Sequence, residues 1–336
     1  MEYNLFFIKN RNSVIIPLAY NIFMYNYMTS KDKLPYYEKN IGLQDEFVDV
    51  LETNLKSLYD SDSNMVMLLD FKNIFSCNRP FKNCSNTDFV KNVVFANIDN
   101  NLSVKNRLIS CIPNLKEKQI NGGTCLCIDQ SKISQVETIN FKKLYDEYIL
   151  RLLEKSNSII DHSDNWVYLD SSGVYANYYI RIKNIFYYPD IYTYIIYRLV
   201  EHISEFQDFN KIDALISTSK TGGIIATLVG AMLDKKVIHC LGIGPKNVAD
   251  IENINEKIRT SKNYYLISDF VCLGTEVKII NTIVTCLKAN IIGGVAVASY
   301  IDIQGNNDYS TSSLNKIYPL SNVNECEIDF KVSVLK

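Results

Sequence analysis

Residues 264–276, which read YYLISDFVCLGTE, decide the fold of this chain. A β-rich apolar run leads to Asp269, a Gly-Thr turn follows, and the apolar residues beyond it recur at helical spacing. The stretch therefore predicts a strand, a loop and a helix N-terminus. Because backbone N–H groups at a helix start lack internal partners, we expect a phosphate near Gly274 and Thr275, with Asp269 facing sugar hydroxyls or Mg²⁺. An ordinary βα turn is the alternative interpretation.

Composition is that of a globular protein. Of 336 residues, 47% are hydrophobic and 21% charged, which allows two domains with sizeable cores. The net charge of -2 gives no global reason to expect nucleic acid or an anionic membrane as a partner. No apolar run approaches the roughly 18 residues of a membrane span, and residues 1–8 lack the basic residues of a signal peptide.

The nine cysteines form no C-x-x-C pair. An odd number of scattered cysteines in apolar segments indicates reduced thiols, and hence a cytoplasmic location. The three histidines, His162, His202 and His239, have no i,i+4 spacing, so a zinc site is not expected.

The chain is predicted to hold two domains, an N-terminal α/β domain over residues 1–138 and a second domain over 139–336. In the first, helical spacing marks residues 43–59 and 102–112, and compact apolar runs mark strands at 65–71, 93–98 and 124–128. Residues 76–87 and 114–123 are interpreted as loops. Asp70 and the turn 121–124 are interpreted as strand-end and turn residues, and the role of this domain is left open.

In the second domain strands alternate with helices. A hairpin is expected over 166–182, a helix over 191–206, strands at 214–216, 237–241 and 294–301, and a helix over 224–233. This alternation predicts a mainly parallel sheet flanked by helices, with right-handed crossovers. Ligands of such sheets bind beyond the carboxyl ends of the strands, where the loops 217–223 and 269–276 both lie.

Three motifs follow one another in the order found in orotate phosphoribosyltransferases. Ser171-Ser172-Gly173 with residues 178–180 and 189–190 resembles the amino-terminal hood of that family. The loop 217–223 resembles its pyrophosphate loop, and residues 264–276 resemble its phosphoribosyl-pyrophosphate (PRPP) signature. The resemblance spans about residues 139–310 and implies a type I phosphoribosyltransferase fold that binds PRPP or a nucleotide with Mg²⁺.

The resemblance also implies roles for individual residues. Asp269 would contact a ribose hydroxyl and Mg²⁺, and Lys220 and Lys246 are the cations available for the departing pyrophosphate. The hood residues would face the base, and a homodimer is to be expected from the family. The phosphate and ribose would be held by Ser268, Cys272, Leu273, Gly274 and Thr275, and the pyrophosphate by Thr218, Ser219, Thr221 and Gly222.

Several positions depart from the family pattern. Ser268 stands where the family has the first of two acids, and Cys272 where a phosphate-binding threonine is usual. Glu276 lies where it would repel a phosphate unless its side chain is turned away. Only Lys246 remains of the basic residues of the lid, and Ser171 replaces a basic residue that commonly meets orotate.

Three functions therefore stay open. The chain is expected to be a phosphoribosyltransferase that transfers a phosphoribosyl group to or from a nucleobase. The alternative is a non-catalytic sensor or effector, for example in bacterial defence, that keeps the fold and binds PRPP or a nucleotide. A Rossmann-type dinucleotide enzyme is disfavoured, because Gly242-x-Gly244 lacks the third glycine and is followed by Pro245.

Overall fold

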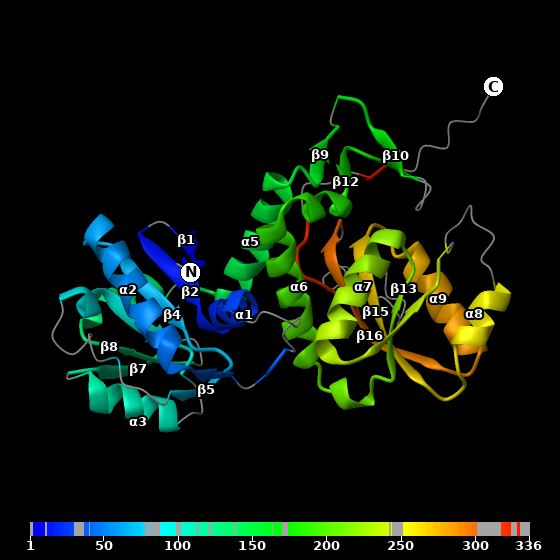
Figure 1. Cartoon of the computed structure of the whole chain (residues 1–336). Helices are drawn as coiled ribbons and strands as arrows, with labels where there is room; N and C mark the ends of the chain where they lie inside the picture. The colour runs from blue at the N-terminus through cyan, green and yellow to red at the C-terminus, as the bar shows by residue number, and fades with distance from the viewer. Residues whose placement is uncertain are drawn as a thin grey trace. The chain divides into compact units, whose positions relative to one another are not determined.

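The computed structural model divides the chain into two compact units, Met1–Leu144 and Tyr145–Lys336 (Figure 1). The residues that it describes are 3–10, 12–29, 37–39, 41–77, 81, 88–98, 102–112, 114–120, 123–137, 139–162, 164–169, 174–241, 243, 251–300, 317–323 and 328–329.

The N-terminal unit holds a six-stranded sheet in the order β1-β2-β4-β6-β8-β7. Its strands are β1 (Ile8–Asn10), β2 (Ser13–Pro17), β4 (Val66–Asp70), β6 (Val93–Ala96), β7 (Lys116–Ile120) and β8 (Gly123–Cys127). The helices are α1 (Leu18–Thr29), α2 (Asp45–Ser61), α3 (Leu102–Cys111) and α4 (Gln130–Val136), with a 3-10 helix at Asp88–Asn92. A separate parallel pair joins β3 (Ile41–Leu43) to β5 (Ile74–Cys77).

The centre of this sheet is parallel. β2, β4 and β6 run in one direction, while β1, β8 and β7 extend it as antiparallel strands. Every residue of β2, β4, β6 and β8 is buried, as expected for strands that are covered on both faces. The predicted loop over 114–123 is wrong for its middle part, because the polar strand β7 pairs with β8 as an edge.

The C-terminal unit is built on five parallel strands in the order β14-β13-β15-β16-β17. These are β13 (Ala214–Ser217), β14 (Lys236–His239), β15 (Asn263–Val271), β16 (Asn290–Ser299) and β17 (Ile317–Pro319). The predicted mainly parallel α/β sheet is confirmed. Its helices are α6 (Pro189–Ser204), α7 (Lys220–Leu233), α8 (Ile251–Lys257) and α9 (Thr275–Cys286). Helix α5 (Phe141–Lys155) begins in the N-terminal unit, which ends at Leu144, and continues into the C-terminal unit.

Helices cover both faces of this sheet (Figure 1). α7 packs on β13 and β15, with α6 against α7 and β16. On the other face α9 buries Val277, Ile280 and Val284 in one core cluster with Leu266 and Ala296. This layering leaves the N-termini of α7 and α9 at the carboxyl edge of the sheet.

A group of short strands follows α5. The predicted hairpin is confirmed in β10 (Val167–Leu169) and β11 (Val174–Ala176), which pair antiparallel, and β18 (Ile328–Asp329) adds to β11. β9 (Ile159–Asp161) pairs with β12 (Tyr178–Ile180). Short 3-10 helices at Ile182–Tyr187 and Phe209–Lys211 complete the unit.

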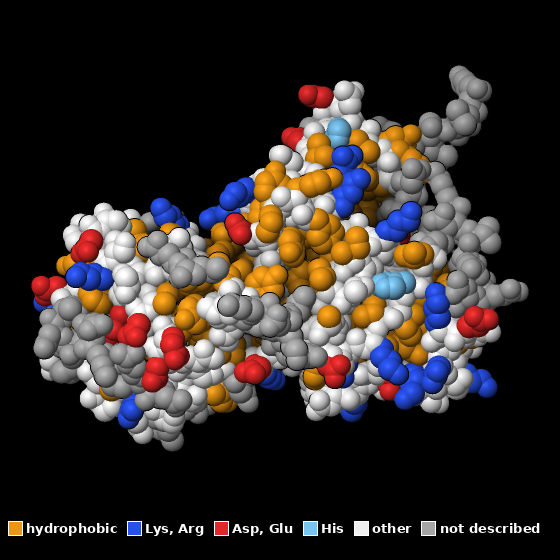
Figure 2. Space-filling model, viewed as in Figure 1, with side chains coloured by type: hydrophobic (Ala, Val, Ile, Leu, Met, Phe, Trp, Pro, Cys, Tyr) orange, Lys and Arg blue, Asp and Glu red, His pale blue; other side chains and the backbone are white. Residues whose placement is uncertain are grey.

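Charged side chains of both signs appear on the visible face of each unit (Figure 2), in keeping with the net charge of -2. Within the described part of the chain, no helix combines the length and the hydropathy that a membrane crossing requires.

Candidate functional site at the carboxyl edge of the C-terminal sheet

The unequal lengths of β13 and β15 create the site. Ser217, the last residue of β13, pairs with Ile267, so β15 continues beyond the end of its neighbour. Successive side chains of a strand point to opposite faces. Asp269 therefore lies on the face that carries α7, beside the first turn of that helix, and Ser268 lies on the face of α9.

Ser219 links the first turn of α7 to Asp269. Its hydroxyl accepts a hydrogen bond from the Gly222 backbone N–H at 2.9 Å and donates one to Asp269 Oδ1 at 2.8 Å. Ser219 is thus the N-cap of α7, which satisfies a backbone donor that has no helical partner. Gly222 allows the first turn of α7 to lie close to Asp269, since a Cβ atom at this position would be 2.8 Å from Ser219 Oγ and 3.4 Å from the Asp269 backbone nitrogen.

A second hydrogen bond joins the same two loops. Thr218 donates from its hydroxyl to Glu276 Oε2 at 3.0 Å. Thr218 is buried, and Glu276 is a half-buried residue in the first turn of α9. Glu276 is expected to repel a phosphate unless its side chain is turned away. This contact fixes the Glu276 carboxylate at the loop after β13.

Burial sets the electrostatics of the two acids. Loss of hydration raises the pKa of Asp269 above its usual value, although hydrogen bonds from Ser219, from backbone N–H groups and from Thr221 oppose the shift. The pKa of Glu276 is also raised, first by burial and then by the negative charge of Asp269, against the hydrogen bond from Thr218. A bound cation would stabilise the charged forms of two neighbouring carboxylates of this kind. Mg²⁺ is commonly held by one or two carboxylates together with substrate phosphates.

The turn before α9 forms the second half of the site. Gly274 has φ 70°, a left-handed conformation that glycine adopts without the steric cost of a side chain. A cavity of about 30 Å³, room for one or two water molecules, lies here. It is lined by Ser268, Phe270, Val271, Cys272, Gly274, Thr275, Glu276 and Val277.

No protein-family model and no curated protein sequence matches the chain. Solved structures of phosphoribosyltransferases are similar to it. The orotate phosphoribosyltransferase from Aeropyrum pernix is 13% identical, with a TM-score of 0.40 over 52% of this chain and 93% of that one. An adenine phosphoribosyltransferase from Saccharomyces cerevisiae is 14% identical, with a TM-score of 0.38 over 52% and 98%. UMP synthase from Leishmania donovani is 12% identical, with a TM-score of 0.42 over 84% of this chain and 54% of that one.

Most of the candidate residues lie together at this edge. Thr218, Ser219, Thr221 and Gly222 face Asp269 or Glu276 or belong to the same turn, as the contacts above describe. On the α9 side, Ser268 lines the small cavity, but its hydroxyl donates to the Phe270 carbonyl oxygen at 3.0 Å. The half-buried Leu273 belongs to the turn without lining the cavity.

The first of the two candidate cationic side chains, Lys220, is exposed at the first position of α7. Lys246 and the hood residues Ser171-Ser172-Gly173 lie outside the described residues. The loop predicted to hold pyrophosphate is also shorter than expected, because the Ser219 cap starts α7 at Lys220 and places Thr221 and Gly222 in the helix rather than in a loop.

His239 also borders the site, although it is not among the predicted site residues. It ends β14 at the same edge, where its Nδ1 lies 3.2 Å from Ser217 Oγ and its Nε2 lies 3.4 Å from Thr227 Oγ1. A Cβ atom on Gly223 would lie 3.0 Å from His239 Nδ1, so the glycine makes room for the ring. The signal was present in the sequence, since a polar residue ending a parallel strand next to a glycine-containing helix start is placed at this edge.

Proposed function

We propose that the C-terminal unit binds a ribosyl phosphate, either PRPP or a nucleotide, together with Mg²⁺, and transfers a phosphoribosyl group to or from a nucleobase. One observation carries the proposal. Two helix N-termini at one sheet edge are joined by the Ser219–Asp269 and Thr218–Glu276 hydrogen bonds. Anion-binding backbone groups and cation-binding carboxylates are thereby brought together, which is what a phosphate ester with Mg²⁺ requires.

The two helix starts divide the ligand between them. The N–H groups after Gly274 and the Thr275 hydroxyl would hold the 5′-phosphate, with one phosphate oxygen reaching into the small cavity. The first turn of α7 would hold the pyrophosphate at Lys220 and Thr221, since the Gly222 N–H already donates to Ser219 Oγ. Asp269, beside the first turn of α7, would accept hydrogen bonds from ribose hydroxyls.

Asp269 and Glu276 are also the residues that would hold Mg²⁺. When bound, the ion would neutralise charge on the pyrophosphate and assist its departure. Ser219 and Thr218 would position the carboxylates, whose raised pKa values favour an added positive charge. Lys220 and Lys246 are the cationic side chains proposed to stabilise the departing pyrophosphate.

Turnover is tested by incubating the full chain with PRPP, Mg²⁺ and a panel of nucleobases, and by measuring pyrophosphate release. The proposed transferase releases pyrophosphate with at least one base. Absence of release across the panel, with the protein folded, contradicts catalysis.

A binding protein without turnover is the second candidate. It is favoured by Ser268, which stands in place of a second acid, lies on the opposite face from Asp269 and bonds to its own strand. Calorimetry with PRPP separates the candidates. Micromolar binding without pyrophosphate release supports the sensor, and absence of binding by any ribosyl phosphate contradicts both.

Thr275→Val tests the phosphate side of the site. It removes a hydroxyl with little change in shape, so PRPP affinity should fall about tenfold. Thr282→Val is the matched control, because Thr282 is exposed on the same helix and its hydroxyl donates to the Lys278 carbonyl oxygen. Equal affinity of the two variants would show that Thr275 does not contact the ligand.

A further inference from the structure

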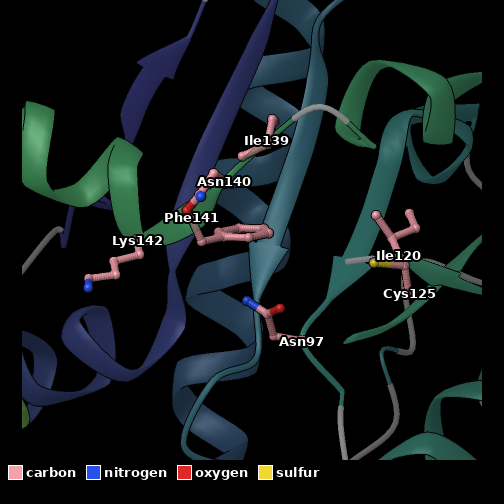
Figure 3. A pocket seen from close by; sticks show the side chains of 7 residues that line it. All are labelled: Asn97, Ile120, Cys125, Ile139, Asn140, Phe141 and Lys142. Carbon is pink, nitrogen blue, oxygen red and sulfur yellow. The ribbon is translucent and has the colours of Figure 1, made fainter. Parts of the chain in front are cut away.

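A cavity of about 390 Å³ in the N-terminal unit has no part in the function proposed above. It lies at the edge of the sheet where β4 and β6 end, and its volume is within the range of about 300–1,000 Å³ typical of small-molecule sites. It is lined by Asn97, Ile120, Cys125, Ile139, Asn140, Phe141 and Lys142 (Figure 3).

Asn97 presents a hydrogen-bond acceptor to this cavity. It follows β6 with φ 57°, a left-handed conformation that asparagine tolerates. Its Nδ2 donates to Oδ1 of the buried Asp70 at 2.8 Å. A carboxylate oxygen only accepts, so the amide nitrogen must face Asp70. The amide carbonyl oxygen is then turned to the side of Ile120 and Cys125 (Figure 3).

Asn140 presents the complementary donor. Its Oδ1 accepts from the Lys143 backbone N–H at 3.1 Å, at the start of α5. Because a backbone N–H only donates, the amide oxygen is committed to that contact and the NH₂ group is left for the cavity side.

An aromatic ring lies between these two amides. The half-buried Phe141 ring stands between Asn97 and Asn140 (Figure 3). Ile120, Ile139 and Cys125 supply apolar lining. Lys142, the one charged residue among the described lining residues, extends away from the other labelled side chains (Figure 3).

We propose that this cavity binds an uncharged nucleobase, free or as a nucleoside, stacked on Phe141 and held by Asn97 and Asn140. Nucleobases carry N–H and C=O or ring-nitrogen groups around a planar ring, so one edge can donate to the Asn97 carbonyl oxygen while another edge accepts from the Asn140 NH₂ group. Stacking on an aromatic ring supplies affinity for any planar base. The buried Asp70 is a positioning residue, because it acts on the ligand only by orienting the Asn97 amide.

Calorimetric titration of the full chain with uracil, cytosine, adenine and hypoxanthine, and with their ribosides, tests the proposal. The expected result is saturable binding of at least one base, and comparison with its riboside separates a free-base site from a nucleoside site. Absence of saturable binding by every member of the panel overturns the proposal.

Three variants locate the binding. Asn140→Asp keeps the oxygen that caps Lys143 but replaces the NH₂ donor by an acceptor, so affinity should fall about tenfold while the melting temperature is unchanged. Phe141→Leu should weaken binding about tenfold through loss of stacking. Asn97→Gly should weaken it similarly, since glycine accepts the left-handed φ.

The matched control is Asn64→Asp. Asn64 is exposed at the opposite edge of the sheet, just before β4, and should leave affinity unchanged. The titrations are repeated on the Asp269→Asn protein to separate this site from the C-terminal one. Binding that persists there and is lost in Asn140→Asp supports the proposal. Binding that is lost in Asp269→Asn and kept in Asn140→Asp overturns it, because the base then occupies the C-terminal unit.

Discussion

Ser219→Ala removes a single hydroxyl group, yet it is expected to destabilise the C-terminal unit strongly. The change removes the N-cap of α7, which costs about 1 kcal/mol, and a hydrogen bond to a carboxylate, worth about 1.5–3 kcal/mol. Together these lower the free energy of unfolding by about 2–4 kcal/mol. For a domain of about 150–250 residues that is a fall of about 5–15 °C in melting temperature, measured by circular dichroism on the full chain.

The loss should depend on pH in a defined direction. Burial raises the folded-state pKa of Asp269, so stability falls as pH rises through that pKa. The Ser219 hydroxyl opposes the shift, and its removal raises the pKa of Asp269 further. The deficit of Ser219→Ala should therefore grow as pH rises through the folded-state pKa. Below the unfolded pKa of about 3.9, the charge-dependent part disappears and the capping loss remains.

Thr282→Ala is the control for Ser219→Ala, because it removes an exposed hydroxyl from α9 that donates to the Lys278 carbonyl oxygen of its own helix. Its melting temperature should stay close to that of the wild type. A Ser219→Ala protein as stable as this control, or one whose deficit is the same at every pH, would refute the proposed link between the α7 cap and Asp269.

Three further changes test the packing of the C-terminal unit by thermal or chemical denaturation. Gly230→Ala should lower the free energy of unfolding by about 1–3 kcal/mol, since its Cβ would lie 2.4 Å from Val237 Cγ2; full stability would mean that α7 packs less closely on β14. Arg198→Met should cost about 3–5 kcal/mol by leaving the buried Glu201 carboxylate without its ion pair, and a double change with Glu201→Gln should recover much of this loss. Gly274→Ala should cost about 1–2 kcal/mol at φ 70°, and an unchanged midpoint would argue against the left-handed turn.

Much of the fold could be predicted because hydrophobic periodicity and burial agree. Residues 264–267 of β15 are apolar and buried on both faces, as a central parallel strand must be, and α9 follows with its apolar stripe at Val277, Ile280 and Val284. β7 escaped prediction for the opposite reason. Its residues KEKQI are polar, and an edge strand exposed to water carries no apolar signal.

The candidate site was predictable in place but not in detail. Parallel topology alone brings the ends of β13 and β15 together. Side-chain direction is not visible in composition, so the sequence shows Glu276 as a source of repulsion unless its side chain is turned away, and does not identify it as the acceptor for Thr218. The predicted helix over 224–233 begins too late, because the Ser219 cap, a contact within one turn, makes Thr221 and Gly222 helical.

Calorimetric titration of the full chain with PRPP, with and without Mg²⁺, tests the central claim most directly when wild type and Asp269→Asn are compared. The expected result is micromolar, Mg²⁺-dependent binding to the wild type and a loss of at least tenfold in Asp269→Asn, whose fold is intact by circular dichroism. Equal affinity of the two proteins, or no binding of PRPP to the folded wild type, would contradict a ribosyl phosphate site built on Asp269.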